Sequence, residues 1–273
     1  MISSDPILLY ILVMSLRLND LSPYLSFAKK LTSASEKIIK RSTFHRLKID
    51  FKSDKSPVTK IDMKIEKKLR SMIIEKYPNH GIYGEEYKNK NHNSTFMWVI
   101  DPIDGTKSFI NGNGNFGTLI SLCIDNAPVI GIINCPDIKK TWIGIKDNGA
   151  FCNGKKINKS KNNTPLSKLY FSTSGMTAFK STIKNKKYNA LVKKTKYATF
   201  GGDCVQYGLL AEKRIPLVVE SLLKPYDYIP LVNIVEESGG IISDWKGNSL
   251  GFKSNGDVVA SISKKAHQQF LKI

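Results

Sequence analysis

Apolar residues recur with a helical period in two stretches near the start of the chain. In the first, about residues 18–40, Ser22-Pro23 supplies residue types suited to an N-cap and a first-turn proline. In the second, apolar residues between Ile61 and Ile74 share one face, and either Thr59 or Asp62 suits the cap position. We therefore predict two amphipathic helices.

Short apolar runs separated by turns follow these helices. Ile82 to Glu86 predicts a short strand that ends in two acids, and Phe96 to Ile100 predicts a buried strand that Pro102 and Gly105 stop. Further runs with near alternation and tight turns between them lie within residues 116–146. The pattern predicts an α+β lobe, with helices on one side of an antiparallel sheet.

The second half of the chain has the pattern of another lobe. Residues 153–166 are rich in Lys and Asn and predict an exposed connector, so that the two lobes span residues 17–155 and 167–273. The second lobe mixes strands with helices, which predicts an α/β arrangement. One of its helices is predicted to begin at Asp227 as N-cap and to end near Glu237, before Ser-Gly-Gly.

Residues 1–16 form an extension before the first predicted helix. Its apolar run, residues 6–14, is too short to span a bilayer, and it lacks a basic segment before it and a small-residue cleavage site after it. We therefore expect a cytoplasmic protein without a membrane segment. One hypothesis is that translation starts at Met14, and peptides from upstream of Met14 in native protein would reject it.

Composition and charge bear on the possible partners of the protein and on the state of its cysteines. The chain has 273 residues, enough for a large core, and 42 Lys and Arg against 23 Asp and Glu give a formal charge of +19. Since the cations are scattered without interleaved aromatic residues, we expect no specific nucleic-acid partner, only help in gathering a phosphorylated small molecule. The cysteines lack CxxC spacing and are expected to be reduced: Cys123, Cys135, Cys152 and Cys204.

The segment Asp101-Pro102-Ile103-Asp104-Gly105-Thr106 carries the clearest chemistry. Two acids just past a predicted strand lie at the rim of a sheet, and carboxylates held that close need a cation such as Mg²⁺. Pro102 would help to turn the Ile103 carbonyl toward the same cation, and Gly105 and Thr106 could bind an anion. Asp-Pro and Asp-Gly are also ordinary turn dipeptides, so the rest of the chain has to decide.

Two further acids are candidates for the same site. Glu85 lies at the end of a predicted strand that comes shortly before the Asp101 strand in sequence, so it can reach the same sheet edge, although adjacent glutamates are more often a solvated surface feature. Asp227 could be a metal ligand or only a helix cap, which is worth about 1 kcal/mol.

Together these motifs resemble the inositol monophosphatase-like family of Mg²⁺-dependent phosphatases. The motifs are Gly84-Glu85-Glu86, the Asp101–Thr106 segment, and Tyr226-Asp227 followed by Glu237-Ser238-Gly239-Gly240, and the resemblance runs from about Pro57 to Gly247. It implies a layered αβαβα sandwich of the sugar-phosphatase type, whose two lobes share the active site, and a homodimer.

The resemblance also implies roles for individual residues. Glu85, Asp101, Asp104, Asp227 and the carbonyl of Ile103 correspond to the ligands of about two or three Mg²⁺ ions. Gly105 and Thr106 correspond to the phosphate-binding turn. The implied catalytic residues are Glu85, Asp104 and Thr106, and hydrolysis uses a metal-activated water with no covalent phosphoenzyme. Some relatives have an acid at the position of Ser56, so a third metal is open.

Within the family, the sequence is most similar to the histidinol-phosphatase branch. Gly202-Asp203-Cys204 and Leu223-Lys224-Pro225-Tyr226-Asp227-Tyr228 carry that similarity. Histidinol phosphate has an ammonium and an imidazole, and Asp203 and Glu220 are the candidates for binding them. A helix cap and a strand-end surface acid are the alternative interpretations of these two residues.

Other functions stay open at this point. An inositol monophosphatase and a 3′(2′),5′-bisphosphate nucleotidase use the same metal chemistry, and the nucleotidase would need Lys or Arg near Asp203 and Glu220. A phosphate- or nucleic-acid-binding relative without catalysis is the alternative from another class, and the complete set of acids argues against it.

Overall fold

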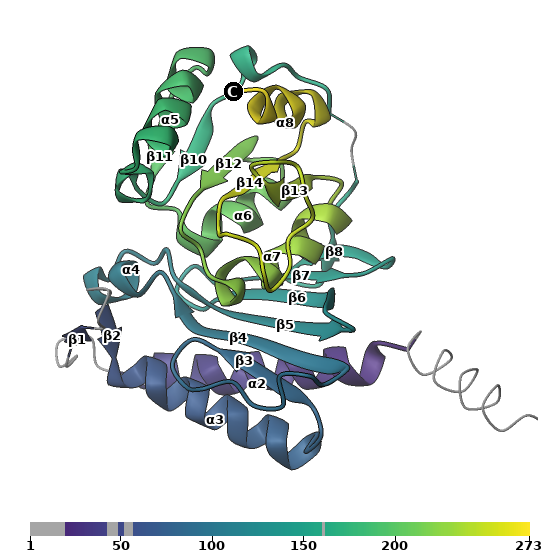
Figure 1. Ribbon diagram of the computed structural model, residues 1–273. Coiled ribbons are helices and arrows are strands. Elements are labelled where there is room, and N and C mark those ends of the chain that lie inside the picture. The colour runs from purple at the N-terminus through teal and green to yellow at the C-terminus, as the bar shows by residue number, and fades with distance from the viewer. Residues whose placement is uncertain (1–19, 43–48, 52–56, 160–161) are drawn as a thin grey trace, which may run out of the picture.

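The structure is a computed structural model, and it describes residues 20–42, 49–51, 57–159 and 162–273 (Figure 1). The extension at residues 1–16, the start-codon hypothesis at Met14 and the third-metal question at Ser56 lie outside these described residues.

Both predicted N-terminal helices are present. Helix α2 (Ser22–Lys40) has Leu21 as its N-cap and Pro23 in its first turn, so Ser22 is the first helical residue and not the cap. Helix α3 (Lys60–Lys76) begins at Thr59, whose hydroxyl accepts the Ile61 N–H at 3.1 Å. The carboxylate of Asp62 accepts the Thr59 N–H at 2.9 Å, so the two candidate caps form one capping box.

The first sheet confirms the predicted meander. Its order is β3-β4-β5-β6-β7-β8-β9, and every neighbouring pair is antiparallel except β3 and β4, which are parallel. The strands are β3 (Gly81–Gly84), β4 (Phe96–Asp104), β5 (Gly117–Ile124), β6 (Ala127–Cys135), β7 (Lys140–Ile145), β8 (Gly149–Cys152) and β9 (Lys155–Lys156). A separate hairpin pairs β1 (Ile49–Phe51) with β2 (Pro57–Thr59).

Strand β4 does not stop at Pro102, so that expectation was wrong. It continues to Asp104, with an irregular register against β5 between Asp101 and Asp104. Its pairing with β3 ends at Ile100, so the next residues have a partner strand on one side only. The missing N–H of Pro102 is therefore tolerated, as it is at a sheet edge or a bulge.

The second lobe contains a mixed sheet of order β11-β10-β12-β14-β13, in which β10 is parallel to β11 and β12 and the remaining pairs are antiparallel. Its strands are β10 (Phe171–Thr173), β11 (Ala198–Phe200), β12 (Leu217–Glu220), β13 (Ile241–Asp244) and β14 (Val258–Ser261). Its helices are α5 (Thr182–Lys194), α6 (Asp203–Ala211), α7 (Pro225–Glu237) and α8 (Lys264–Leu271), with short 3₁₀ turns η2 (Leu166–Lys168) and η3 (Met176–Phe179).

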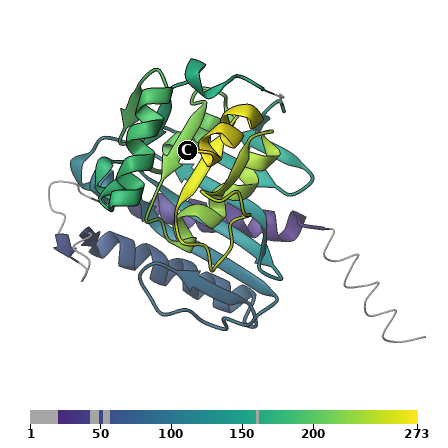
Figure 2. The same ribbon diagram turned by 45° about the horizontal axis from the view of Figure 1, so that its top comes forward.

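The elements stack in layers, which confirms the predicted sandwich (Figures 1 and 2). Helices α2 and α3 cover one face of the first sheet through a core that includes Leu31, Leu69 and Trp98. Helices α6 and α7 lie between the two sheets. Helices α5 and α8 cover the outer face of the second sheet around Phe171 and Phe270.

Helix α7 packs closely on the first sheet because two glycines leave room for its backbone. A Cβ at Gly131 would lie 2.1 Å from the carbonyl oxygen of Pro230, and one at Gly144 would lie 2.4 Å from that of Asn233. These contacts fix the height of α7 above the sheet, and therefore the position of the residues in its first turn.

Three smaller expectations can also be compared with the structure. The predicted connector at residues 153–166 contains β9, which belongs to the edge of the first sheet. All four cysteines are free. Across the described ranges, no helix combines the length and the apolar character that crossing a membrane requires.

Candidate metal centre

Three carboxylates from distant parts of the chain converge at the end of β4. Asp101, Asp104 and Asp227 each place one oxygen within 4.8 Å of the others. Asp101 and Asp104 come from the irregular end of β4, and Asp227 comes from the first turn of α7. The sequence prediction that these three acids meet at one point therefore agrees with the geometry.

Glu85 lies at the same edge. Strand β3 ends at Gly84, which pairs with Ile100 in the parallel register, so Glu85 and Asp101 are the next residues of their two strands beyond this pairing. The negative charge of Glu85 is one of the causes that raise the pKa of Asp101. Parallel pairing of β3 and β4 thus explains how Glu85, sixteen positions before Asp101 in the sequence, lies near the acids of β4.

Asp227 is not the N-cap of α7, so that prediction was wrong. Lys224 is the N-cap, Pro225 is the first helical residue, and Asp227 is the third. The carboxylate of Asp227 accepts the Lys224 N–H at 2.6 Å, which is the capping-box contact of an acid at that position. This contact holds one oxygen of Asp227 in the helix turn and aims the group at β4.

Burial and neighbouring negative charges raise the pKa values of all three acids. Burial is the largest cause for Asp101, followed by the charges of Glu85, Asp104 and Asp227, and the pKa lies well above its usual range. Burial and the charges of Asp203 and Asp227 do the same for Asp104, against a 2.6 Å hydrogen bond from the Cys204 N–H. The pKa of Asp227 is raised to about 7, mainly by burial.

The residues fit a divalent cation. Asp101 is 1% exposed, and its Oδ1 atom has no hydrogen-bond partner among the described residues. A buried carboxylate oxygen without a donor, facing other carboxylates, is costly unless a cation compensates it. Oxygen-only donors of this kind suit Mg²⁺.

The turn after Asp104 has the backbone that an anion site would need. Gly105 has a φ of +80°, and a Cβ there would lie 2.6 Å from the carbonyl oxygen of Asn115. Helix α4 (Thr106–Asn111) starts directly behind it. The Thr106 hydroxyl donates to the carbonyl oxygen of Ile103 at 3.1 Å, so a predicted catalytic residue contacts a predicted metal ligand.

Asp203 stands beside this turn and links the lobes. It is the first residue of α6, after Gly202 as N-cap, so it is not itself the cap. The Ser108 hydroxyl of α4 donates to its Oδ2 at 2.6 Å, and the same oxygen lies 3.0 Å from the Cβ position of Gly105. Burial raises its pKa, against the Ser108 hydrogen bond and the charge of Lys107, which both lower it.

Glu220 ends β12 and is not a surface acid. It is 2% exposed, and its Oε1 accepts from the N–H and hydroxyl of Ser174, at 2.5 and 2.8 Å, and from Nε2 of Gln206, at 2.5 Å. Burial raises its pKa to about 7 in spite of these donors.

Sequence reasoning missed the groups that tie α6 to the metal centre. Besides Ser108 and the Cys204 N–H, these include Tyr207, whose hydroxyl is buried without a hydrogen-bond partner among the described residues. Burial raises the pKa of Tyr207 most, and the charges of Glu220, Asp104 and Asp227 raise it further. Its helical spacing from Asp203, four positions on, was the available signal.

Comparison with known proteins decides the family. The model of the inositol monophosphatase family matches residues 20–273. The chain belongs to this family. The family consists of metal-dependent phosphatases, and the acidic cluster that such chemistry needs is present here.

Similar curated proteins carry two kinds of name. The bifunctional phosphatase IMPL2 of Arabidopsis thaliana is 37% identical over 93% of this chain and 75% of its own length. A histidinol-phosphatase of Chlorobaculum parvum is 31% identical over 79% of this chain and 83% of its own length.

Solved structures agree with the fold. An inositol monophosphatase from Zymomonas mobilis has a TM-score of 0.82 and 36% identity, covering 92% of this chain and 97% of that one. An IMPase from Thermotoga maritima, at 24% identity, has a TM-score of 0.80 over 92% of this chain and 96% of that one. The protein is therefore a hydrolase of the phosphatase class, built on the fold of this family.

Proposed function

We propose that this phosphatase is a Mg²⁺-dependent phosphomonoesterase that converts histidinol phosphate to histidinol and inorganic phosphate, as a cytoplasmic enzyme of histidine biosynthesis. The observation that carries the proposal is the second pair of acids, Asp203 and Glu220, beside the three-carboxylate cluster. A substrate with a phosphate at one end and cationic groups at the other matches this arrangement.

Glu85, Asp101, Asp104, Asp227 and the carbonyl of Ile103 would hold the metal. When bound there, divalent cations lower the pKa of a water and neutralise charge on the phosphoryl group during an in-line displacement.

The remaining groups position the reactants. Glu85 and Thr106 orient the attacking water, while the backbone of Gly105 and Thr106 holds the phosphate. Since phosphoryl transfer needs little covalent chemistry from the protein, catalysis rests on placement and electrostatics. No nucleophilic side chain is required, in keeping with the high pKa of the buried Cys204 thiol.

Asp203 and Glu220 provide the selectivity in this proposal. Asp203 lies against Gly105 and so borders the phosphate turn, which suits it for the substrate ammonium. The Oε2 atom of Glu220 has only a 3.4 Å contact with the Thr173 hydroxyl, so it retains capacity for a donor such as imidazole N–H. The names of the C. parvum protein and of a 27% identical histidinol-phosphatase from Mycobacterium tuberculosis support this substrate.

A bisphosphate nucleotidase is the second candidate. Lys107 lies close enough to Asp203 to lower the pKa of its carboxyl, and a cation there could bind a second phosphate. An inositol monophosphatase would use the same metal centre, and a 27% identical relative from Mesembryanthemum crystallinum carries that name. The proposal includes a homodimer, no specific nucleic-acid partner and no membrane association.

The test is phosphate release by the purified protein with Mg²⁺ from histidinol phosphate, inositol 1-phosphate and adenosine 3′,5′-bisphosphate. We expect faster phosphate release from histidinol phosphate than from the other two substrates. We expect Asp203→Asn to reduce release from histidinol phosphate more than release from inositol 1-phosphate. Preference for another substrate would retain the metal chemistry and reject the substrate assignment. Release from none of the three would favour a binding protein without catalysis.

A further inference from the structure

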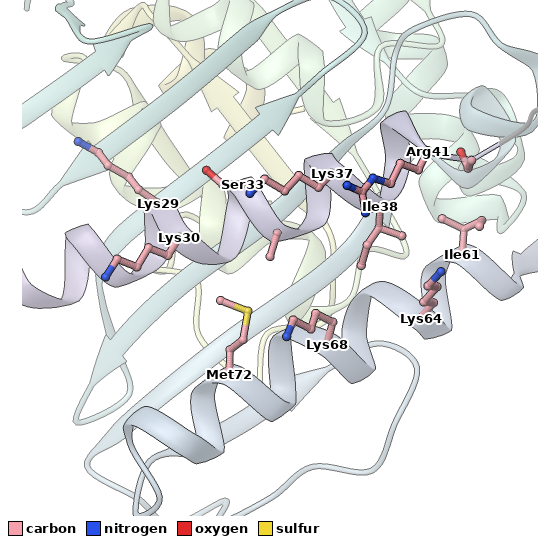
Figure 3. Close-up of a pocket in the computed structure, with 12 residues that line it drawn as sticks. Lys29, Lys30, Ser33, Lys37, Ile38, Arg41, Ile61, Lys64, Lys68 and Met72 are labelled. Atoms are coloured by element: carbon pink, nitrogen blue, oxygen red, sulfur yellow. The ribbon is translucent and has the colours of Figure 1, made fainter.

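Helices α2 and α3 leave a groove of about 780 Å³ between them, while their other faces pack on the first sheet (Figure 3). Ala34 and Ile38 from α2 and Ile61 and Met72 from α3 give it an apolar floor. In Figure 3, Ile38 points from α2 toward α3, and Met72 points from α3 toward α2 farther along the groove. Neither the metal centre nor Asp203 and Glu220 contribute to its lining, so the phosphatase function leaves this groove unexplained.

Six cations surround the apolar floor: Lys29, Lys30, Lys37, Arg41, Lys64 and Lys68. Within the described ranges, none of these six forms an ion pair. Glu36 of α2 pairs with Lys40, and Glu66 of α3 pairs with Arg70. Of the other acids of the two helices, Asp62 accepts the Thr59 N–H, and Glu75 lies beside Lys30 in a neighbouring hollow, without an ion pair among the described residues. The groove thus combines partly exposed apolar side chains with positive charge that the protein itself does not compensate.

We propose that this groove binds an amphipathic helix of a partner protein, with carboxylates on both sides of an apolar stripe. Two helices with a groove between them bind a third helix through anchors at helical spacing. From Lys29 to Arg41 the groove follows α2 for about 18 Å, at about 1.5 Å per residue, which matches some three to four turns of helix. Opposite charge at the rim steers such a partner and fixes its orientation.

Other occupants fit the chemistry less well. Nucleic acid would use the cations but would leave the apolar floor uncovered, and the described lining offers no aromatic ring for base stacking. A second copy of this chain would bring the same cations face to face, and like charges in contact are unfavourable. Residues 1–19 contain a single acid, Asp5, and so lack the carboxylates that the rim requires.

The probe for this proposal is a fluorescein-labelled 18-residue helical peptide with Leu at i, i+3, i+4 and i+7 spacing and Glu on both flanks. Binding is followed by fluorescence anisotropy to the full-length protein. Lys37→Glu together with Lys68→Glu should weaken binding at least about tenfold, equivalent to about 1.4 kcal/mol. Met72→Ser should weaken it about threefold or more, since it removes apolar floor without a change of charge.

A matched control reverses the same number of charges elsewhere. Lys196 and Lys272 line a different hollow, and Lys196→Glu with Lys272→Glu should change peptide affinity less than about twofold. All variants should retain phosphate release, which reports that they are folded, because the substituted residues lie outside the metal centre.

Three results would overturn the proposal. One is an equal loss of affinity in the control variant, which would mean general attraction between a basic protein and an acidic peptide. Another is peptide binding that survives Met72→Ser and persists for a sequence-scrambled peptide of the same charge. The third is tighter binding to vesicles with phosphatidylserine, or to a single-stranded RNA oligonucleotide, than to the helical peptide.

Discussion

Glu220 at the end of β12 and the cluster around Asp101 are both buried acids, and they differ in how their charge is compensated. Glu220 has three donors on one oxygen, from Ser174 and Gln206. Asp101 has an oxygen with no hydrogen-bond donor among the described residues and faces three other acids. The protein's own donors compensate the charge of Glu220, whereas the charge of the cluster around Asp101 needs a bound cation.

The difference separates acids whose charge the protein compensates with its own hydrogen-bond donors from acids whose charge needs a bound cation. A buried carboxylate with its own donors can stabilise the fold, because the hydrogen bonds offset the cost of burial. A buried carboxylate without such donors lowers stability unless a cation is bound, so its presence indicates a functional role. Amide substitutions at the two places should therefore act in opposite directions.

The largest effect is expected at the centre of the cluster. Asp104→Asn should reduce phosphate release at least about 10²-fold, because loss of a direct ligand should exceed the effect of losing an outer hydrogen-bond partner. Asp125→Asn, in the exposed β5–β6 turn, is the control and should change release less than about twofold. Nearly unchanged turnover in Asp104→Asn would contradict the assignment.

The next largest effect is expected in the free energy of unfolding of two amide variants, measured in EDTA. Glu220→Gln should lower the free energy of unfolding by about 3 kcal/mol, because its amide group would face donors where the carboxylate accepts. Asp101→Asn should raise the same quantity by roughly 1 kcal/mol, because it removes one of the repelling charges. Urea unfolding followed by tryptophan fluorescence measures both free energies. A change of the same sign in the two variants would contradict the proposed difference between Glu220 and Asp101.

The pH dependence of the metal-free protein should show the same contrast. Folding raises the pKa of Asp227 to about 7 and those of Asp101 and Asp104 well above their usual range. Between the unfolded value of about 4 and pH 7 the folded protein therefore binds more protons, so its stability falls as pH rises.

The melting temperature in EDTA should accordingly be higher at pH 5 than at pH 8. Mg²⁺ should raise it more at pH 8, where the carboxylates are ionised and do not have to release protons first. A melting temperature in EDTA that rises from pH 5 to pH 8 would argue against raised pKa values in this cluster.

The smallest effect concerns two tyrosines. The Tyr207 hydroxyl is buried without a partner in the described structure, so Tyr207→Phe should change the free energy of unfolding by less than about 0.5 kcal/mol. The Tyr228 hydroxyl donates to the Gly251 carbonyl at 2.9 Å, and Tyr228→Phe should cost about 1 kcal/mol. A larger loss in Tyr207→Phe than in Tyr228→Phe, by urea unfolding, would reveal a hydrogen bond at Tyr207.

Sequence alone predicted the parts of the site that depend on local pattern. The Asp101–Thr106 segment, the strand before Glu85 and the cap at Thr59 all have their signals within a few residues. The layered fold and the position of Asp227 near β4 came from the resemblance to a family, since hydrophobic spacing does not place one lobe against the other. The functional roles of Glu85, Ile103, Thr106 and the other site residues stay predictions.

The features that sequence analysis did not predict depend on contacts between distant segments. Pro102 normally ends a strand, and only the one-sided pairing of β4 shows why it does not here. Asp227 resembles an N-cap in sequence, but the true cap is Lys224, whose backbone N–H needs no particular side chain. The Ser108 contact of Asp203 and the donors around Glu220 likewise come from other elements.

The central claim is that the Asp101, Asp104 and Asp227 cluster holds the metal on which phosphate release depends. Titration calorimetry with Mg²⁺ on wild type and Asp101→Asn, combined with phosphate release from histidinol phosphate in the same samples, tests it most directly. The account predicts binding and release in the wild type, loss of release in EDTA with recovery on added Mg²⁺, and at least about tenfold weaker binding in the variant. Release that is insensitive to EDTA, or equal Mg²⁺ binding by both proteins, would contradict it.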